Sequence, residues 1–426
     1  MEQADMRADL VITGPAQLLT CAPDAADHVG LLTRGPLDRD DFGVAISGDR
    51  IVAVGDVSGY EATRRIDASG MVVMPGFVDS HTHLVFGGDR SAEYAAKVAG
   101  LEPPPGAVVG ITGTMSATRD LPVEVLVAEA RPRIDQMISS GTTTVEVKTG
   151  YGLSLDSEWR MLQANEVLRS AYGIDIVSTY LGGHGIAPGR DPDEWTREII
   201  GQLPAVAEAG LARFNDVYCD VGYFSEEQTR AILAAGVEVG LQAKIHLDAY
   251  SHTGAAALTA ELGAVSADHL NFTDEAELAR LAEAGVTGVY MPCLEYSVNH
   301  QNPLDPRRVR DAGVELAIAT DLCPGCWATS METVIAMACR TGGLSVPEAI
   351  RAATLGGAKA LGLGEETGAL VPGRRADVIV VDVPSHEHLA YRLSGGNVRT
   401  VIASGRVVSE RAPSATGGAE TSGETP

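Results

Sequence analysis

The sequence has little positive charge and almost no lysine. Its 32 basic residues, only four of them lysine, face 57 acidic residues, and the formal net charge is −25. Nucleic acids and anionic membrane surfaces are bound through basic footprints. The composition therefore argues against nucleic acid and against an anionic membrane as partners.

Cysteines and long apolar runs are also scarce. Six cysteines are scattered over 426 residues, unlike the dense pattern of a disulfide framework. No apolar run approaches the roughly 20 residues of a membrane-spanning helix. The first residues, MEQADMRADLVITG, lack the basic segment and apolar core of a signal peptide. With 45% hydrophobic and 21% charged residues, the composition is that of a soluble globular protein, which we expect to be cytoplasmic.

The rhythm of the sequence changes between the chain ends and the middle. Residues 1–75 contain short apolar runs separated by Gly and Asp turns, as at Gly48-Asp49, and residues 371–411 return to this style. Such alternation predicts hairpins. We expect the two segments to form one composite β-sandwich domain. Residues 412–426 are rich in Gly, Ser, Thr and Glu and are expected to be disordered.

The middle segment, residues 76–370, alternates apolar runs with amphipathic stretches rich in Ala and Leu. This pattern is typical of βα units around a parallel sheet. Eight parallel strands, each followed by a helix, close into a (β/α)₈ TIM-type barrel of the α/β class. The eight candidate strands are MPGFVDSHTH, TTTVEVKTG, DIVSTYLGGHG, FNDVYCDVG, LQAKIHLDAY, GAVSADHLNF, VTGVYMPCLEY and ELAIATDLCPG.

Polar side chains stand at the ends of these strands, where such a barrel builds its active site. His81 and His83 end the first candidate strand, and residues i and i+2 of an extended segment point to the same side. His246, His269 and Asp321 end the fifth, sixth and eighth candidate strands. Imidazole nitrogens with one carboxylate suit zinc or iron and leave room for a bound water. The sequence therefore predicts a divalent or trivalent metal ion, either Zn or Fe.

Longer motifs surround these residues. They are PGFVDSHTHLVFGGDR, VEVKTGYGL, LGGHG, KIHLDAYSHTGAAALTAELGAVSADHL, ATDLCPG and GALVPGRRADVIVVD. Together they resemble the imidazolonepropionases, a family of amidohydrolases, from about Asp9 to Val408. HTH, SADH and ATD alone indicate the superfamily, whereas HTHLVFxGxR followed by VKxGYGL is much more specific to the family.

The resemblance implies roles for individual residues. The matched metal ligands are His81, His83, His246 and Asp321. Asp321 is implied to move the proton of the attacking water, and His269 to stabilise the oxyanion. Arg90 matches the residue that grips the propionate carboxylate of the substrate, for which a guanidinium fork is suited. Tyr151 and His184 match two further substrate contacts.

The resemblance also implies how many ions and which partners to expect. A second ion would need a bridging carboxylated lysine at a strand end, and Lys148 is the candidate. The family places that lysine in a single-metal site, so we expect one ion per chain. We further expect a homodimer that acts on a small molecule bearing a carboxylate.

The part of the pocket that faces the substrate ring departs from the family pattern. Ala249 stands where the family has a Glu, and Cys323 and Cys326 replace an Asn and a Ser in a turn that keeps Gly325. We expect these four residues to line the substrate pocket. The CxxC motif can also be read as a redox or second-metal site. A redox motif of this kind belongs at a helix start in a small βαβ domain, whereas this one follows a barrel strand.

Three functions remain open. The first is hydrolysis of imidazolone propionate to N-formimidoyl-glutamate in histidine degradation. The second is opening of a substituted imidazolone or hydantoin-like propionate, methylated or sulfur-bearing, because unpaired ring N–H groups would cost about 1–3 kcal/mol each in this pocket. The third is a non-catalytic ligand-binding relative, which only Ala249 supports.

Overall fold

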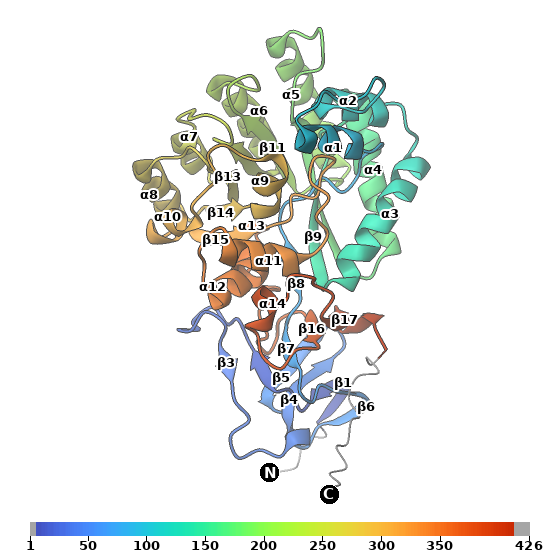
Figure 1. The fold of residues 1–426 in the computed structure, drawn as a ribbon, viewed down its shortest axis with the longest axis vertical. Helices are drawn as coiled ribbons and strands as arrows, with labels where there is room; N and C mark the ends of the chain where they lie inside the picture. Colours follow the sequence, from blue (N-terminus) through green and yellow to red (C-terminus); the bar gives the residue numbers. More distant parts are fainter. Residues whose placement is uncertain (1–5, 413–426) are drawn as a thin grey trace, which may run out of the picture.

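The computed structural model describes residues 6–412 of the chain. A helix-covered barrel stands on a smaller domain of strands (Figure 1). The chain enters the barrel at Gly76 and returns to the smaller domain after Ala360. Apart from residue 412, the predicted disordered tail lies outside the described residues. Within the described part of the chain, no helix is both long and apolar enough to cross a membrane.

The barrel is a single sheet of eight parallel strands. Its strands are β8 (Phe77–Asp79), β9 (Thr142–Lys148), β10 (Asp175–Gly183), β11 (Phe214–Cys219), β12 (Gln242–Leu247), β13 (Ser266–His269), β14 (Thr287–Tyr290) and β15 (Glu315–Ile318). Each strand pairs in parallel with the next along the chain. The ring closes just beyond β8 and β15, where Thr82 and Leu322 form a parallel bridge. The predicted TIM-type barrel is confirmed.

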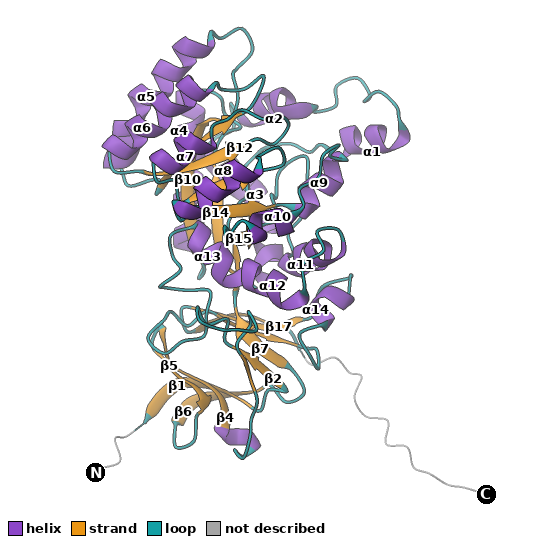
Figure 2. Cartoon of the chain, turned by 90° about the vertical axis from the view of Figure 1, so that its left-hand side faces the viewer, coloured by secondary structure: helices purple, strands orange, loops and turns teal. Residues whose placement is uncertain are grey.

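Helices cover the outside of the barrel (Figures 1 and 2). They are α1 (Ser91–Ala99), α2 (Gly110–Thr118), α3 (Val123–Ser139), α4 (Leu155–Ala171), α5 (Pro192–Glu208), α6 (Glu226–Glu238), α7 (Ala256–Glu261), α8 (Glu275–Glu283), α9 (Pro292–Val298), α10 (Pro306–Asp311), α11 (Met331–Arg340), α12 (Val346–Arg351), α13 (Gly357–Ala360) and α14 (His388–Tyr391). Side-chain caps set the starts of some of these helices: Ser225 and Asp274, for example, form capping boxes at α6 and α8.

The smaller domain consists of two sheets. Its strands are β1 (Arg7–Thr13), β2 (Gln17–Leu19), β3 (Leu31–Leu32), β4 (Phe42–Ser47), β5 (Arg50–Asp56), β6 (Glu61–Asp67), β7 (Val72–Pro75), β16 (Val378–Val381), β17 (Val398–Ala403) and β18 (Arg406–Glu410). One sheet has the order β5-β4-β1-β6, and the other the order β18-β17-β16-β7-β2-β3. The second sheet joins both chain ends, as expected (Figure 1). Apolar side chains of the two sheets, such as Ile12 and Val378, share one core.

The residue that joins the smaller domain to the barrel, Gly76, is tightly packed. β7 ends at Pro75 and β8 begins at Phe77, so the first candidate strand is in fact divided between two sheets at Gly76. A Cβ at Gly76 would lie 2.2 Å from Thr143 Oγ1. Only glycine fits this approach without a shift. The chain then runs directly into His81 and His83.

Candidate metal and substrate site

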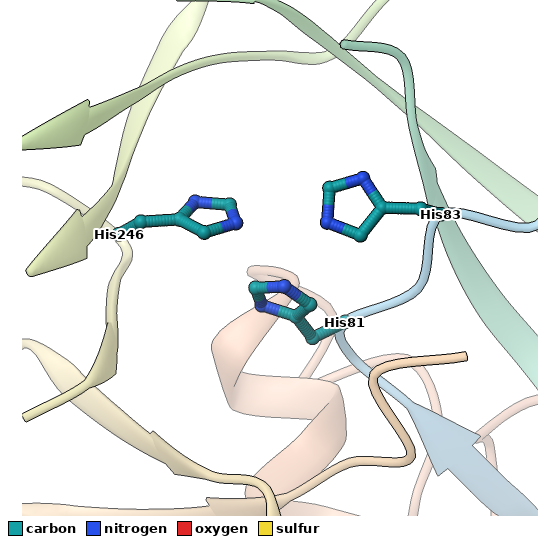
Figure 3. A group of neighbouring side chains, drawn as sticks. All are labelled: His81, His83 and His246. Atoms are coloured by element: carbon teal, nitrogen blue, oxygen red, sulfur yellow. The ribbon is translucent and has the colours of Figure 1, made fainter. Parts of the chain in front are cut away.

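Three imidazoles converge at the end of the barrel where its strands terminate (Figure 3). His81 and His83 follow β8 and His246 lies on β12; the ring centroid of His81 is 4.6 Å from that of His246 and 5.5 Å from that of His83. All three side chains are buried. His81 Nε2 and His246 Nε2 have no hydrogen-bond partner, and the Nε2 side of His83 faces these two rings (Figure 3). Buried polar atoms are seldom left unpaired, so these rings have the form of a donor set for a metal ion.

Asp321 and His269 lie next to these rings. Asp321 Oδ1 is 3.8 Å from His81 Nε2 and 3.9 Å from His83 Nε2. His81, His269 and Asp321 also form a group whose ligand atoms lie within 4.8 Å of one another. Both Asp321 (φ 45°) and His269 (φ 83°) adopt left-handed backbone conformations. Such conformations are costly for non-glycine residues and cluster at functional sites. The structure thus brings together all five residues predicted from the strand ends.

Two carboxylates orient two of the imidazoles. Asp268 Oδ2 is 2.6 Å from His81 Nδ1, and Asp216 Oδ2 is 3.0 Å from His246 Nδ1. A carboxylate at Nδ1 holds the proton there and leaves Nε2 free to bind a metal. Sequence analysis missed both aspartates. Their signal was an aspartate within a predicted barrel strand, β11 or β13.

Burial sets the charge of the site. It lowers the pKa of His81, His83 and His246 well below the usual value, so these rings are neutral, which is the form that binds metals. Burial likewise lowers the pKa of His269 to about 4. In the absence of a cation, burial raises the pKa of Asp321 to about 7, and a bound cation would bring it down again.

A cavity of about 660 Å³ opens beside these groups. Of the predicted substrate contacts, it is lined by Arg90, Tyr151, His184, Cys323 and Gly325. Its positive charges are on Arg90 and Lys97. A cavity lined both by cationic side chains and by metal-binding side chains suits a small ligand that bears a carboxylate.

Two predicted substrate contacts are not on the cavity wall. Ala249 is buried, and its carbonyl accepts a hydrogen bond of 2.8 Å from His300 Nε2. Cys326 is also buried, with Sγ 3.5 Å from Ser297 Oγ. For Cys326, the cause is the conformation of the turn. Cys323 and Cys326 pair through two backbone hydrogen bonds of 3.0 Å, and of the two only Cys323 reaches the cavity.

The CxxC motif does not have the properties of a redox centre. Both thiols are free. Burial raises the pKa of Cys323 and of Cys326, whereas reactive cysteines are thiolates with a lowered pKa. Neither cysteine belongs to a metal-binding group of side chains within residues 6–412. The position of Cys323 favours pocket lining among the three interpretations.

Arg90 is held in place by an acidic neighbour that sequence analysis missed. Its Nε and Nη2 donate to the two oxygens of Glu93 at 2.5 and 3.0 Å. Glu93 also accepts from the backbone N–H of Gly110 at 3.1 Å and pairs with Lys97 at 3.2 Å. Burial opposes ionisation of Glu93, but these partners together lower its pKa to about 2. The i,i+3 and i,i+4 spacing to Arg90 and Lys97 on α1 was the available signal.

Flat aromatic groups form much of the remaining cavity wall. The rings of His83 and His184 stack with centroids 4.6 Å apart, and those of Tyr218 and Tyr223 with centroids 4.0 Å apart. All four residues line the cavity. Stacked faces of this kind suit a planar ring. The two tyrosines had no motif that would have revealed them in the sequence.

Comparison with known proteins supports the fold. Two family models described as "Amidohydrolase family" match residues 202–408 and 64–163. Among solved structures, an adenosine deaminase from Xanthomonas campestris with bound zinc has a TM-score of 0.69 at 20% identity and covers 95% of this chain and 93% of that one. Atrazine chlorohydrolase from Arthrobacter aurescens, complexed with zinc, has a TM-score of 0.68 at 19% identity, covering 94% and 95%.

Relatives in sequence are much closer. The imidazolonepropionase of Halobacterium salinarum is 40% identical over 409 residues, which cover 94% of this chain and 97% of that protein. That of Geobacillus kaustophilus is 41% identical, covering 80% and 82%, and that of Symbiobacterium thermophilum is 38% identical, covering 94% and 97%. The resemblance found in the motifs is thereby confirmed over nearly the whole chain. This chain belongs to the imidazolonepropionase family of amidohydrolases.

Proposed function

We propose that the chain catalyses the reaction for which these relatives are named. It hydrolyses a C–N bond in the cyclic amide of imidazolone propionate and releases N-formimidoyl-glutamate, a step of histidine degradation. Relatives at 35–41% identity over most of the chain support this reaction. The structural observation that carries the proposal is the set of three converging buried imidazoles, two of them with unpartnered Nε2 atoms, beside a cavity that also contains Arg90.

The proposed metal site holds one ion, zinc or iron. Its ligands would be His81, His83, His246 and Asp321. When bound, the ion activates a water molecule and polarises the ring carbonyl. A single ion is supported by Lys148: burial opposes its charge, but three neighbouring carboxylates outweigh burial and raise its pKa. A protonated amine in this setting is not available as a bridging carbamate.

The side chains around the metal group would handle protons and charge. Asp321 borders the cavity and is placed to accept the proton of the attacking water and to return it to the leaving ring nitrogen. His269, kept neutral by its lowered pKa, can donate its N–H to the oxyanion of the tetrahedral intermediate. Both groups line the same cavity as the substrate contacts.

The propionate carboxylate would bind at Arg90. Glu93 occupies the Nε and Nη2 side of the guanidinium, so the Nη1 end remains for the substrate. Tyr151 and His184, whose ring centroids are 5.1 Å apart, line the same cavity as Arg90 and His83. The carboxylate thus fixes one end of the substrate while its ring reaches the metal group.

The test is direct. The purified, metal-loaded chain is mixed with imidazolone propionate, and loss of ring absorbance is followed together with formation of N-formimidoyl-glutamate. Turnover with that product is expected. Binding without turnover would instead identify the chain as a ligand-binding relative.

A second candidate substrate is a substituted ring, sulfur-bearing, methylated or hydantoin-like, that still carries the propionate. Among the cavity-lining residues of the described chain, Asp321 is the one carboxylate, and it belongs to the metal group. A ring N–H donor thus has no free carboxylate to pair with, while Cys323 presents a sulfur to the cavity. The kcat/KM values for the parent and the substituted rings, measured side by side, decide between the two candidates.

We also propose that the chain works as a homodimer in the cytoplasm. Large apolar side chains of α1 and the segment after it, Tyr94, Val98 and Leu101, are between 47% and 72% exposed and could be covered by a second copy. Light scattering on the purified chain would give about twice the mass of one chain for a dimer, and fractionation of its host would give the location.

A further inference from the structure

Lys148 lies at the centre of a buried cluster of charges beneath the metal group. Its Nζ is 2.8 Å from Asp216 Oδ2, 3.3 Å from Asp268 Oδ2 and 3.1 Å from Glu146 Oε1. All four side chains are fully buried. An ammonium group removed from water is tolerated only with such partners, and breaking a buried pair leaves an uncompensated charge.

Two of these carboxylates are the ones that hold the imidazoles. Asp268 is 2.6 Å from His81 Nδ1 and Asp216 is 3.0 Å from His246 Nδ1. Lys148 therefore connects, through one atom, the two groups that orient His81 and His246. Without it, two buried carboxylates would repel each other. Asp216 would then be free to turn away from its histidine, and Asp268 would keep the hydrogen bond from Ser266 Oγ at 2.6 Å.

We infer that Lys148 is a positioning residue for the metal site, which acts by locking Asp216 and Asp268 against His81 and His246. The inference rests on the metal dependence proposed above. It adds Lys148, which is not one of the proposed metal ligands. Outer partners of metal-bound histidines change metal affinity by about ten- to a hundredfold when they are removed. Loss of Lys148, which secures two such partners together, is expected to lie in that range.

Lys244 is a matched control. It is equally buried, and its Nζ bonds to Glu146 Oε2 at 2.7 Å and to the carbonyl of Ser80 at 3.1 Å. It shares Glu146 with Lys148, but no hydrogen bond of its own joins it to the two aspartates that hold the histidines. Its charge still acts on Asp268. Comparing variants of the two lysines therefore separates the effect of losing the Lys148 contacts from the effect of losing one buried positive charge.

The experiment measures zinc binding rather than turnover. Wild type, Lys148→Met and Lys244→Met are stripped of metal and titrated with zinc against a competing chelator, and the thermal unfolding of each metal-free protein is recorded. Lys148→Met is expected to weaken zinc binding ten- to a hundredfold. Lys244→Met is expected to change it less than about threefold, even if both variants unfold at a lower temperature.

Equal weakening in the two lysine variants, or none in Lys148→Met, would overturn the inference. If Lys148→Met does not fold, Asp216→Asn supplies the second measurement, since it keeps the shape of the side chain but removes the charge that Lys148 binds. It should weaken zinc ten- to a hundredfold and change the absorption spectrum of bound Co(II), and an unchanged affinity and spectrum would contradict the inference. Failure of the proposed reaction would instead appear as tight zinc binding without turnover of imidazolone propionate.

Discussion

At the scale of single residues, Arg90 is the residue proposed to bind the substrate carboxylate. Arg90→Ala is expected to raise KM for imidazolone propionate about ten- to a hundredfold, because hydrogen bonds to a charged group contribute about 1.5–3 kcal/mol. The measurement is steady-state kinetics with the acid and with its neutral amide. The amide should show almost no change between wild type and variant, and an equal loss for both compounds would place the carboxylate elsewhere.

Cys323 is the residue that tests the nature of the ring. Cys323→Ser keeps the size of the side chain but removes its polarisable sulfur, so it should shift the ratio of kcat/KM toward the parent ring, by about three- to tenfold, if the natural ring bears sulfur. Cys326→Ser is the matched control, because Cys326 lies behind the wall. A ratio that moves equally in both variants would show that the effect does not come from contact with the ring.

The sequence was sufficient to find the proposed metal ligands, which the structure brings together, but not the aspartates that contact them. The pair His81 and His83 could be predicted because side chains two apart on a strand share one side. Which thiol of the CxxC reaches the cavity depends on the backbone pairing of that turn, which no spacing reveals. Asp216 on β11 contacts His246 on the neighbouring strand β12, whereas Asp268 on β13 contacts His81, which follows the non-adjacent strand β8. Both contacts depend on how the strands are arranged in the closed barrel.

At the scale of elements, α9 contains a carboxyl group that makes stability depend on pH. Burial raises the pKa of Glu295 to about 7, against the opposing effect of the Leu304 N–H and the Asn271 amide. The stability contributed by its protonated form is complete below the unfolded value near 4.5 and is lost as pH rises through about 7. Ionisation of Glu295 should therefore lower the free energy of unfolding of wild type by about 1–3 kcal/mol between pH 4.5 and pH 7.

Glu295→Gln removes the ionisable carboxyl group and keeps the shape of the side chain. Both hydrogen bonds are accepted by one oxygen, Oε1, which the amide retains. Chemical unfolding at pH 5 and pH 7.5 should show the variant gaining on wild type at the higher pH. Glu283→Gln, at the exposed end of α8, should follow wild type at both values. A Glu295 variant with the pH dependence of wild type would contradict the burial argument.

Gly76, between β7 and β8, lies at a boundary with no room for a larger side chain. Gly76→Ala would place a methyl group 2.2 Å from Thr143 Oγ1, so the variant should lose about 1–3 kcal/mol of unfolding free energy. Thr143→Ala in the same chain removes the two nearest atoms and should restore part of the loss. Additive destabilisation in the double variant would show that the two residues do not meet.

This boundary also marks where strand prediction from sequence failed. The run MPGFVDSHTH reads as one strand, because Pro75 and Gly76 occupy only two positions within an apolar stretch. In the structure Met74 pairs with Ile379 of β16, whereas Val78 pairs with Thr144 of β9. The other seven barrel strands could be predicted since each is a separate apolar run between helical stretches.

At the scale of the whole molecule, the metal site ties together strands that are far apart in the sequence. His81 follows β8, His246 ends β12 and Asp321 follows β15, at the point where the barrel ring closes. An ion held by all of them joins the first and last strands of the barrel. Binding to the folded chain alone stabilises it by an amount that grows with metal concentration, about 2.7 kcal/mol at a hundredfold excess over Kd.

Removal of the metal should therefore lower the melting temperature as well as abolish turnover. The measurement is a thermal scan of the chain as purified, after treatment with a chelator, and after zinc or iron is added back. The as-purified and reloaded samples should melt several degrees above the stripped sample, with one ion per chain by elemental analysis. His246→Ala, which removes one proposed ligand, should melt at nearly the same temperature with and without added metal. If the stripped wild type kept both its melting temperature and its turnover, the four-residue site would not be where this enzyme works.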